Sequence, residues 1–419
     1  MLDLDDDNRD VRLVLLVGVV IGLVNLVYVF VASPVHVGID YRVYHLAGNV
    51  ALEGGNFYQA VPDGLPGYFH YVYPPITVLG FVPLALLGSE TIGFAVHTAQ
   101  TVLVGLAAAW LLVRYLERVG DGRLPWLDRG LIGAFVVGSV HSMSSLFFGQ
   151  VNHHLVAALV VGFVALDTDR ETLAGAAFAF AAFLKVFPAA VGLWLLRRRA
   201  WRAIAAAVGF AAVGFAAGLA VFGPELTVAY VERAIIPRFS PEAFAGGLDP
   251  GETYLTIRRP ISVLLPTVDP PLYGLLAGLV LAPPVVYLYR TIEDREDRLV
   301  SIMGTMAAVL VFFPSFPIYF VILYFPLIPL LYLLESGRPR QLLLAGALVS
   351  SVAVRYDDVL TGFEMAGESP QLLETVVRPV FTFVTPGLMG VLVILGACLL
   401  QRRRKHGPQF VVRNGPETQ

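Results

Sequence analysis

The sequence is poor in lysine, in cysteine and in charge as a whole. Only 15% of its 419 residues are charged and 57% are hydrophobic, whereas a soluble globular domain carries about 25% charged residues. This composition excludes an ordinary soluble domain and predicts a chain that lies in a lipid bilayer. The single cysteine, Cys398, excludes an intrachain disulfide. A formal net charge of −3 gives no sign of nucleic-acid binding.

Lysine is nearly absent, so the position of each lysine is informative. Only Lys185 and Lys405 occur, and Lys185 lies in the middle of the apolar run FAAFLKVFPAAVGLWLL. A lysine at the centre of a membrane helix costs roughly 2.5–3.5 kcal/mol, so a partner or a water-filled cavity is expected. Pro188 predicts a locally loosened helix. The functional interpretation is an ammonium that neutralises a phosphate or pairs with a buried acid. The alternative is a structural ion pair or a snorkelling side chain.

Long apolar runs predict an all-α polytopic membrane protein. They mark roughly twelve transmembrane helices in one integral membrane domain over residues 1–419, with the run Pro74–Leu87 as one of the shorter spans. Arginine-rich segments predict the cytoplasmic side and place both termini there, in a multi-pass protein of the cell membrane. The segment Arg114–Arg129 then falls outside, against the positive-inside expectation.

This helix count leaves three long polar segments outside the membrane and a cytoplasmic tail. Long loops in compact proteins are usually functional or disordered, and short interfacial helices are expected within these three. The first is expected to be the catalytic loop. The segments are residues 33–73, 223–270 and 355–378, followed by the tail 401–419.

The first outer segment carries a carboxylate, Asp40, at the start of the run DYRVYHLAGNVALEGGNFYQA. A helix that starts there brings Tyr41, Tyr44 and Gly48 to one face, with the tyrosines at headgroup depth. Asp40 is interpreted either as a helix N-cap or as a general base. A sugar or lipid hydroxyl attacks an anomeric carbon more readily when a positioned acceptor takes its proton. Glu53 and Asp63 are the other carboxylates of this loop.

Polar groups elsewhere add weaker signals. The run FFGQVNHHL, which contains Gln150 and Asn152, lies by helix count at the cytoplasmic end, unless its flanking segments form a re-entrant hairpin. It favours a hydrogen-bonded turn over a metal site, because its adjacent histidines point about 100° apart on a helix. In the second outer segment, Arg258 and Arg259 are expected either to clamp a phosphate or simply to be solvated. Tyr254 beside them is expected to stack on a sugar or headgroup.

Four motifs in order resemble those of glycosyltransferase family 87, a family of polyprenyl-phosphate-dependent mannosyltransferases with the GT-C membrane architecture. They lie between residue 40 and about residue 205. The motifs are Asp40-x-x-x-Tyr44 followed by Glu53-Gly54-Gly55 and Tyr58, Tyr71-Val72-Tyr73-Pro74-Pro75, Gly149-Gln150-Val151-Asn152, and Lys185-Val186-Phe187-Pro188 followed by RRRAWRA.

The resemblance implies a membrane glycosyltransferase with a GT-C-type bundle. Such an enzyme transfers a hexose, typically mannose, from a polyprenyl-phosphate donor to a lipid or glycan acceptor outside the cytoplasm, with inversion. No cofactor and no metal are expected. Asp40 takes the role of base. The expected donor-phosphate residues are Lys185, Arg258 and Arg259, and the expected substrate-binding residues are Tyr44, Tyr71, Tyr73, Gln150, Asn152, Tyr254 and Tyr319.

The second half of the chain departs from the family pattern. The late run FPSFPIYFVILYFPLIP contains Ser315 and Tyr319, but lacks the histidine that often follows a Ser-Trp pair in the family. A lipid-linked sugar transporter or flippase is the alternative function, and a non-catalytic scaffold is a third. A transporter predicts internal repeats and carboxylates deep in apolar spans, and neither feature is evident in this sequence.

Overall fold

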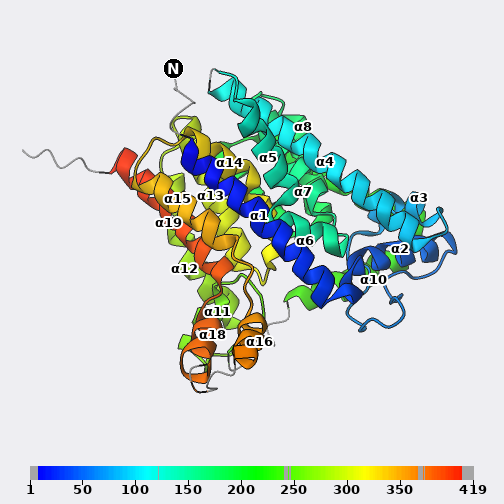
Figure 1. Cartoon of the computed structure of the whole chain (residues 1–419). Helices are drawn as coiled ribbons and strands as arrows, with labels where there is room; N and C mark the ends of the chain where they lie inside the picture. The colour runs from blue at the N-terminus through cyan, green and yellow to red at the C-terminus, as the bar shows by residue number, and fades with distance from the viewer. Residues whose placement is uncertain are drawn as a thin grey trace, which may run out of the picture.

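Helices and loops make up the described part of the chain. A computed structural model describes residues 8–120, 122–239, 244, 247–366, 371 and 373–407. No strand occurs among these residues, which confirms the predicted all-α class. Figure 1 shows a bundle of long helices with two projecting parts, one formed by α2 and α3 and the other by α11, α16 and α18.

Five helices in the described ranges are long and apolar enough to cross a bilayer. They are α1 (Arg9–Ala32), α4 (Glu90–Val119), α10 (Trp201–Tyr230) with its π-helical continuation η4 (Val231–Ile235), α12 (Leu272–Tyr289) and α19 (Pro386–His406). The number rises to six if α5 (Trp126–Gly138) and α6 (Val140–Phe148), bent by 44°, count as one span. The chain is therefore a multi-pass membrane protein, and the expected count of about twelve spans is not confirmed.

Several apolar runs form helices too short to cross a bilayer upright. The predicted span Pro74–Leu87 is instead the 3₁₀-helix η2 (Pro75–Gly80) and the single turn α3 (Val82–Ala85), because prolines interrupt helical hydrogen bonding there. The other short elements of the bundle are α7 (Asn152–Asp167), α8 (Glu171–Leu184), η3 (Phe187–Ala190), α9 (Val191–Arg198), η7 (Pro317–Leu323), α14 (Tyr324–Leu333) and α15 (Arg338–Ser350). The helix α13 (Arg295–Phe312) has 18 residues, but it is not among the five candidate spans.

The core lies around α13 and α14, whose side chains are buried on nearly every face. Small residues let neighbouring helices approach closely, as is common in membrane bundles. A Cβ on Gly22 of α1 would lie 2.2 Å from the carbonyl oxygen of Gly138, and a Cβ on Gly390 would lie 2.2 Å from Ser350 Oγ. Larger residues at these two glycines would force α1 away from α5 and α15 away from α19.

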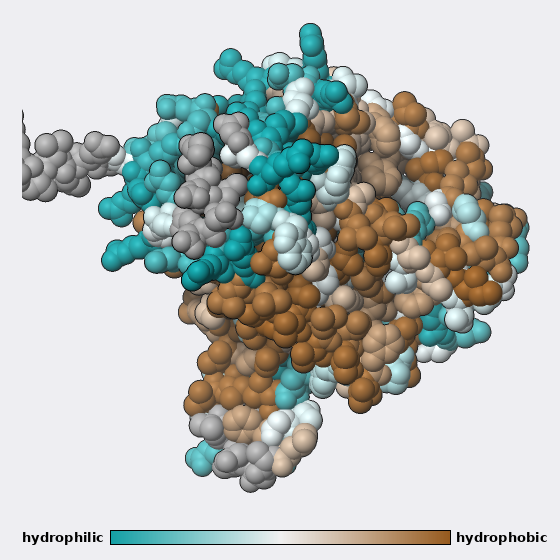
Figure 2. Space-filling view, turned by 45° about the horizontal axis from the view of Figure 1, so that its top comes forward, coloured by the Kyte–Doolittle hydropathy of each residue, from teal (hydrophilic) through white to brown (hydrophobic). Residues whose placement is uncertain are grey.

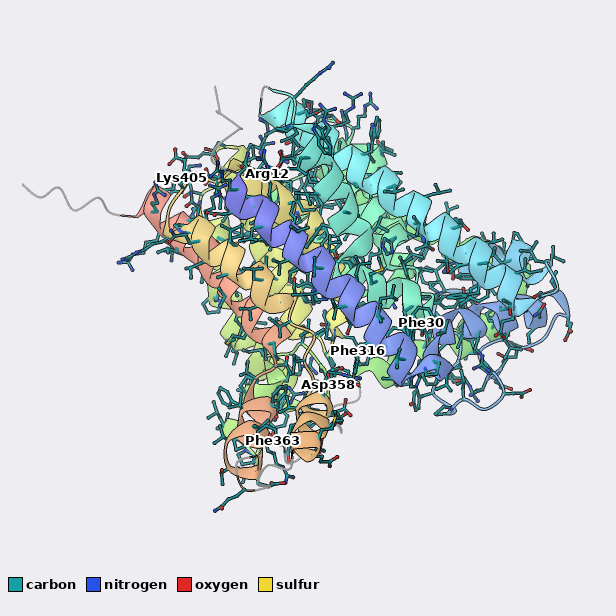
Figure 3. The ribbon with its side chains drawn as sticks, in the orientation of Figure 1. Arg12, Phe30, Phe316, Asp358, Phe363 and Lys405 are labelled. Carbon is teal, nitrogen blue, oxygen red and sulfur yellow. The ribbon has the colours of Figure 1, made fainter. Side chains whose placement is uncertain are left out.

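Charged residues gather at one end of the bundle. Arg12 of α1 forms an ion pair with the buried Asp128 at 2.8 Å, and Tyr332 donates a hydrogen bond to the same carboxylate. Lys405 at the end of α19 pairs with acidic residues that begin α13. Figure 3 labels Arg12 and Lys405 at this end, and Figure 2 shows a hydrophilic surface where α19 ends, beside a broad hydrophobic surface.

This arrangement corrects the expected position of the segment Arg114–Arg129. Because Asp128 binds Arg12, the segment lies at the same end as the first residues of α1. Residues 74–87 do not form a span, and one crossing fewer places the four arginines with the other basic clusters. The exception to the positive-inside rule therefore disappears.

The predicted outer segments contain short helices. Residues 33–73 hold η1 (Pro34–His36) and α2 (Ile39–Leu52), and residues 223–270 begin inside α10 and include η5 (Ile236–Phe239) and α11 (Arg258–Leu264). Residues 355–378 hold α16 (Tyr356–Ala366) and η8 (Leu373–Val377), which leads into α18 (Arg378–Phe383). Residues 240–243, 245–246, 367–370 and 372 of these segments lie outside the described residues. Of the tail 401–419, residues 401–406 belong to α19 and residues 408–419 lie outside the described ranges.

Candidate active site

A cavity of about 680 Å³ lies where α2, α6 and the α8–η3 junction meet. This volume is within the range of about 300–1,000 Å³ that is typical of ligand sites. The wall includes Asp40, Gln150, Lys185 and Tyr319, which come from four separate parts of the chain. In Figure 3 the lining residue Phe316 lies near Phe30 and Asp358, at the opposite end of α1 from Arg12.

Helix α2 brings Asp40 to the cavity. The helix begins after Gly38, which is its N-cap in the left-handed region with φ 67°, so Asp40 lies in the first turn and is not the N-cap. Tyr41 and Gly48 are buried away from the cavity, whereas Tyr44 lines it. Both tyrosines are buried in protein, so the prediction that they lie at headgroup depth is wrong. The Asp40 side chain is half-buried, because it faces the cavity while protein surrounds the remainder.

Lys185 reaches the cavity because helix α8 ends there. Its backbone is extended, with φ −149° and ψ 130°, and the chain resumes as η3 at Phe187. This break is the loosening that Pro188 predicts. The side chain is buried, and its ammonium donates to Tyr319 Oη at 3.1 Å and to Gln150 Oε1 at 3.3 Å. The ammonium also lies 4.7 Å from the centre of the Tyr319 ring, within cation–π range.

Gln150 joins the base and the cation. Its amide oxygen accepts from Lys185, and its side chain lies close enough to Asp40 for the amide NH₂ to act on the carboxylate as a hydrogen-bond donor. Gly149 makes this approach possible. It ends α6 with φ 77°, and a Cβ there would lie 2.6 Å from Tyr41 Cβ. The GQVN turn therefore lies beside α2, and the cytoplasmic position derived from helix counting is corrected.

Tyrosines complete this side of the cavity. Tyr44, one turn after Asp40, shares a hydrogen bond of 2.8 Å with the hydroxyl of Tyr73, and both side chains line the cavity. The Tyr73 ring centre lies 5.4 Å from the Lys185 ammonium. Burial raises the pKa of Tyr44 well above its usual 10 and also raises the pKa of Tyr73. Both phenols therefore remain protonated at neutral pH and act as hydrogen-bonding groups.

The pKa of Asp40 depends on opposing effects of burial and of nearby polar groups. Burial raises the pKa of the Asp40 carboxyl above its ordinary value, because protein replaces water around the charge. The Lys185 ammonium and the Gln150 hydrogen bond both act in the opposite direction. A carboxylate whose pKa lies closer to neutrality accepts a proton more effectively. Glu53 and Asp63, the other carboxylates of the first segment, are exposed and do not line the cavity.

Five predicted site residues are not in this wall. Asn152 lies one turn behind it and donates to Ser145 Oγ at 2.8 Å, while Tyr71 bonds Thr77 at 2.7 Å. Tyr254 packs on Phe316, with ring centres 4.9 Å apart. The residues not brought to the cavity are Asn152, Tyr71, Tyr254, Arg258 and Arg259.

The two arginines have structural partners. Arg259 is fully buried and donates to the carbonyl oxygens of Phe381, Asp249 and Glu252, so it fastens the second outer segment to α18. Arg258 lies over the rings of Phe244 and Phe312. The sequence predicts that both arginines bind phosphate. In the structure the guanidinium groups contact backbone carbonyls and aromatic rings and do not line the cavity.

Replacement of Arg259 by alanine is expected to lower stability and leave the cavity intact. The change removes a buried charged donor from three backbone carbonyl groups, which costs about 2–3 kcal/mol. Thermal unfolding in detergent measures the effect. Arg258→Ala is the matched control and should cost less, about 0.5–1 kcal/mol, because it removes cation–π contacts alone. Equal losses from the two variants would contradict this structural role.

Several lining residues have no motif in the sequence. The buried His141 and the half-buried Ser144 of α6 line the cavity together with Asn25 of α1. Arg355 lies at the mouth and pairs with Asp358 at 3.1 Å. His141 and Asn25 are polar residues within apolar runs, which is the one sequence signal that identifies them. The sequence does not single out Arg355, because its loop contains several other charged residues.

A second cavity of about 450 Å³ adjoins the first. Its wall is mainly apolar and comes from α4, α8, α10 and the η2–α3 segment. Tyr73 lines both cavities, so its ring contacts the charged site and the apolar one. Phe180, Phe210 and Val213 in this wall are also exposed on the outer surface of the bundle.

The site therefore combines a carboxylate base with a buried ammonium in one enclosed space. Such a pair can take a proton from a hydroxyl group and stabilise an anionic leaving group. Within the described ranges, no group of three or more side chains is arranged to hold a metal ion.

Comparison with known proteins identifies the family of the chain. The model of glycosyltransferase family 87 matches residues 71–315, a range that contains Gln150 and Lys185 and begins after Asp40. A Mycolicibacterium smegmatis protein, the polyprenol-phosphate-mannose-dependent alpha-(1-2)-phosphatidylinositol pentamannoside mannosyltransferase, is 33% identical over 181 residues, 42% of each chain. A phosphatidylinositol mannoside mannosyltransferase of the same organism and donor dependence is 27% identical over 201 residues, 44% of each chain.

The similarity to these two curated relatives spans less than half of their length. The family model, in contrast, covers more than half of this chain, and its range includes three of the four motifs quoted above. The chain belongs to glycosyltransferase family 87.

Proposed function

We propose that this protein is a membrane mannosyltransferase that uses a polyprenyl-phosphate mannose donor. The observation that carries the proposal is the junction of Asp40, Gln150 and Lys185 in one cavity. The family supports the reaction class, and the relatives named above use this donor. A lipid acceptor that bears sugar is favoured because both relatives act on phosphatidylinositol mannosides.

In the proposed reaction Asp40 is the general base and the sugar is inverted in a single displacement. The acceptor hydroxyl loses its proton to Asp40 while its oxygen forms a bond to the anomeric carbon. The bond from that carbon to the phosphate oxygen breaks, and the lipid phosphate leaves with the electron pair. Lys185 neutralises the charge that grows on this phosphate. The donor has one phosphate, so the ammonium can take the role that a divalent cation has with diphosphate donors.

The membrane arrangement follows from the same proposal. A GT-C-type bundle with about twelve crossings, some of them bent or short, would hold the cavity on the extracytoplasmic side. Both termini would be cytoplasmic, with the basic cluster around Arg12 and Lys405. The apolar cavity beside Tyr73 is a suitable place for the polyprenyl chain, because its exposed aromatic wall faces the lipid.

Transfer in a reconstituted system tests the function. The purified protein in liposomes is supplied with radiolabelled polyprenyl-phosphate mannose and phosphatidylinositol mannoside, in the presence of EDTA. Formation of a larger labelled mannolipid is expected. Movement of label across the bilayer without transfer would instead support the transporter alternative. A requirement for added Mg²⁺ would contradict the role given to Lys185.

A second prediction concerns Gln150. Replacement by leucine removes a hydrogen bond that lowers the pKa of Asp40, so that pKa rises. The base must be deprotonated, and kcat/KM falls as the pH drops through its pKa. The acidic limb of the pH–rate profile is therefore expected to move to higher pH. Gln150→Glu is not a neutral control, because it adds a charge beside Asp40. Asn152→Leu is the control. This residue lies outside the cavity wall, so its replacement should not move the acidic limb of the pH–rate profile.

A further inference from the structure

The wall of the main cavity formed by α1 and α6 differs in character from the wall that carries Asp40. It holds Asn25 of α1 with His141 and Ser144 of α6, and none of these three side chains carries a formal charge at neutral pH. Asn25 Nδ2 lies 3.4 Å from Ser144 Oγ, so the amide and the hydroxyl are near neighbours. The α1–α6 wall is therefore neutral and polar, whereas the charged lining residues Asp40, Lys185, Glu252 and Arg355 come from other parts of the chain.

His141 is held rigidly in this wall. It lies directly after the 44° bend between α5 and α6. Ser142 Oγ stabilises the bend by donating to the Val136 carbonyl at 2.7 Å, and the Tyr324 hydroxyl bonds Ser142 at 2.9 Å. The imidazole ring stacks on Phe320, with ring centres 4.6 Å apart and planes inclined by 29°.

One ring nitrogen of His141, Nε2, makes no hydrogen bond within the described part of the protein. The side chain is 4% exposed. Backbone carbonyls of Pro317 and Ser350 lie near the ring, but neither makes a hydrogen bond with Nε2. Buried polar atoms are almost always paired. A buried imidazole in the cavity wall with one unpaired nitrogen is a suitable partner for a ligand hydroxyl.

We propose that Asn25, His141 and Ser144 form a subsite that binds the hydroxyl groups of a neutral sugar ring. The inference rests on the proposed function and deepens it, because it assigns the sugar to the α1–α6 wall and the phosphate to Lys185. Amide, hydroxyl and imidazole groups each donate and accept hydrogen bonds. Tyr28 and Phe148 in the same wall add aromatic surface. The sugar belongs either to the donor or to the acceptor.

Paired lipids distinguish these two sources. Equilibrium binding to the full chain in nanodiscs is measured for polyprenyl-phosphate mannose against polyprenyl phosphate, and for phosphatidylinositol mannoside against phosphatidylinositol. His141→Phe keeps the stack on Phe320 and removes both ring nitrogens. The second variant, Ser144→Ala, removes one hydroxyl group. His45→Phe is the control, because this half-buried histidine lines neither of the two cavities.

The wild type is expected to prefer the mannosylated lipid of at least one pair. His141→Phe should reduce that preference about fivefold, as the loss of one or two net hydrogen bonds predicts, and leave the sugar-free lipid unaffected. The pair that responds identifies the source of the sugar. Unchanged preferences in His141→Phe and Ser144→Ala would overturn the subsite alone. A wild type with no preference in either pair would overturn the subsite and count against the proposed function as well.

Discussion

Replacement of Asp40 by asparagine is expected to lower kcat by about 10²–10⁴-fold, the usual contribution of a general base. The amide is close in shape to the carboxylate but cannot take a proton from the acceptor hydroxyl. Asp40 lines the cavity beside Gln150 and is half-buried, so the asparagine variant should keep its fold and its donor affinity. The measurement is mannose transfer under saturating donor, together with donor binding.

The control for Asp40→Asn is Glu53→Gln. Glu53 is a carboxylate of the same loop that is exposed and lies outside the cavity. Its replacement should change kcat by less than about twofold. Full activity of Asp40→Asn would remove this residue from the chemistry. Equal losses in the two variants would instead point to a general effect of charge on the loop.

The second large effect is expected for Lys185→Met. The change removes a buried ammonium that bonds Gln150 and Tyr319 but keeps most of the apolar stem. Loss of a charged hydrogen bond costs about 1.5–3 kcal/mol, so kcat/KM should fall roughly 10–100-fold. The loss should be larger for binding of polyprenyl-phosphate mannose than for binding of the acceptor. Binding of donor and acceptor is measured separately by titration.

The same variant should change the pH dependence. Lys185 lowers the pKa of Asp40 against the effect of burial, so its removal raises that pKa further. The active form of Asp40 is the deprotonated one. Activity is lost as the pH falls through the pKa, and the acidic limb therefore moves to higher pH in Lys185→Met. Lys185→Arg keeps the charge and should leave the limb close to its wild-type position. A limb that moves to lower pH in the methionine variant would contradict the assignment of Asp40.

Part of the candidate site could be predicted, because some of its residues are recognisable from their neighbours in the sequence. Asp40 and Tyr44 are one helical turn apart, and a helix from Ile39 places both on the cavity side. Lys185 is a lone cation in an apolar run, which requires a partner. Arg258 and Arg259 have equally suitable chemistry, but backbone carbonyls and aromatic rings surround them. A sequence does not reveal which carbonyl groups will lie around a guanidinium.

Helix counting explains the remaining differences. A count based on hydropathy treats each apolar run as a crossing, whereas prolines and glycines divide several runs into short or bent helices. One false crossing at residues 74–87 reverses the side assigned to every segment up to the next error. For this reason a helix count separates Arg114 from the start of α1 and, without a re-entrant hairpin, Gln150 from α2, whereas the structure brings both pairs to the same end.

By itself the sequence determined that this chain is helical, lies in a membrane and carries a buried lysine in need of a partner. These properties depend on composition and on spacing within single helices, where hydrophobicity and backbone hydrogen bonding act locally. Only the tertiary structure decided that Gln150 joins Lys185 to Asp40 and that His141 faces the same cavity. These contacts join residues far apart in the chain, and they depend on how helix breaks and glycine contacts set the packing of α2, α6 and α8.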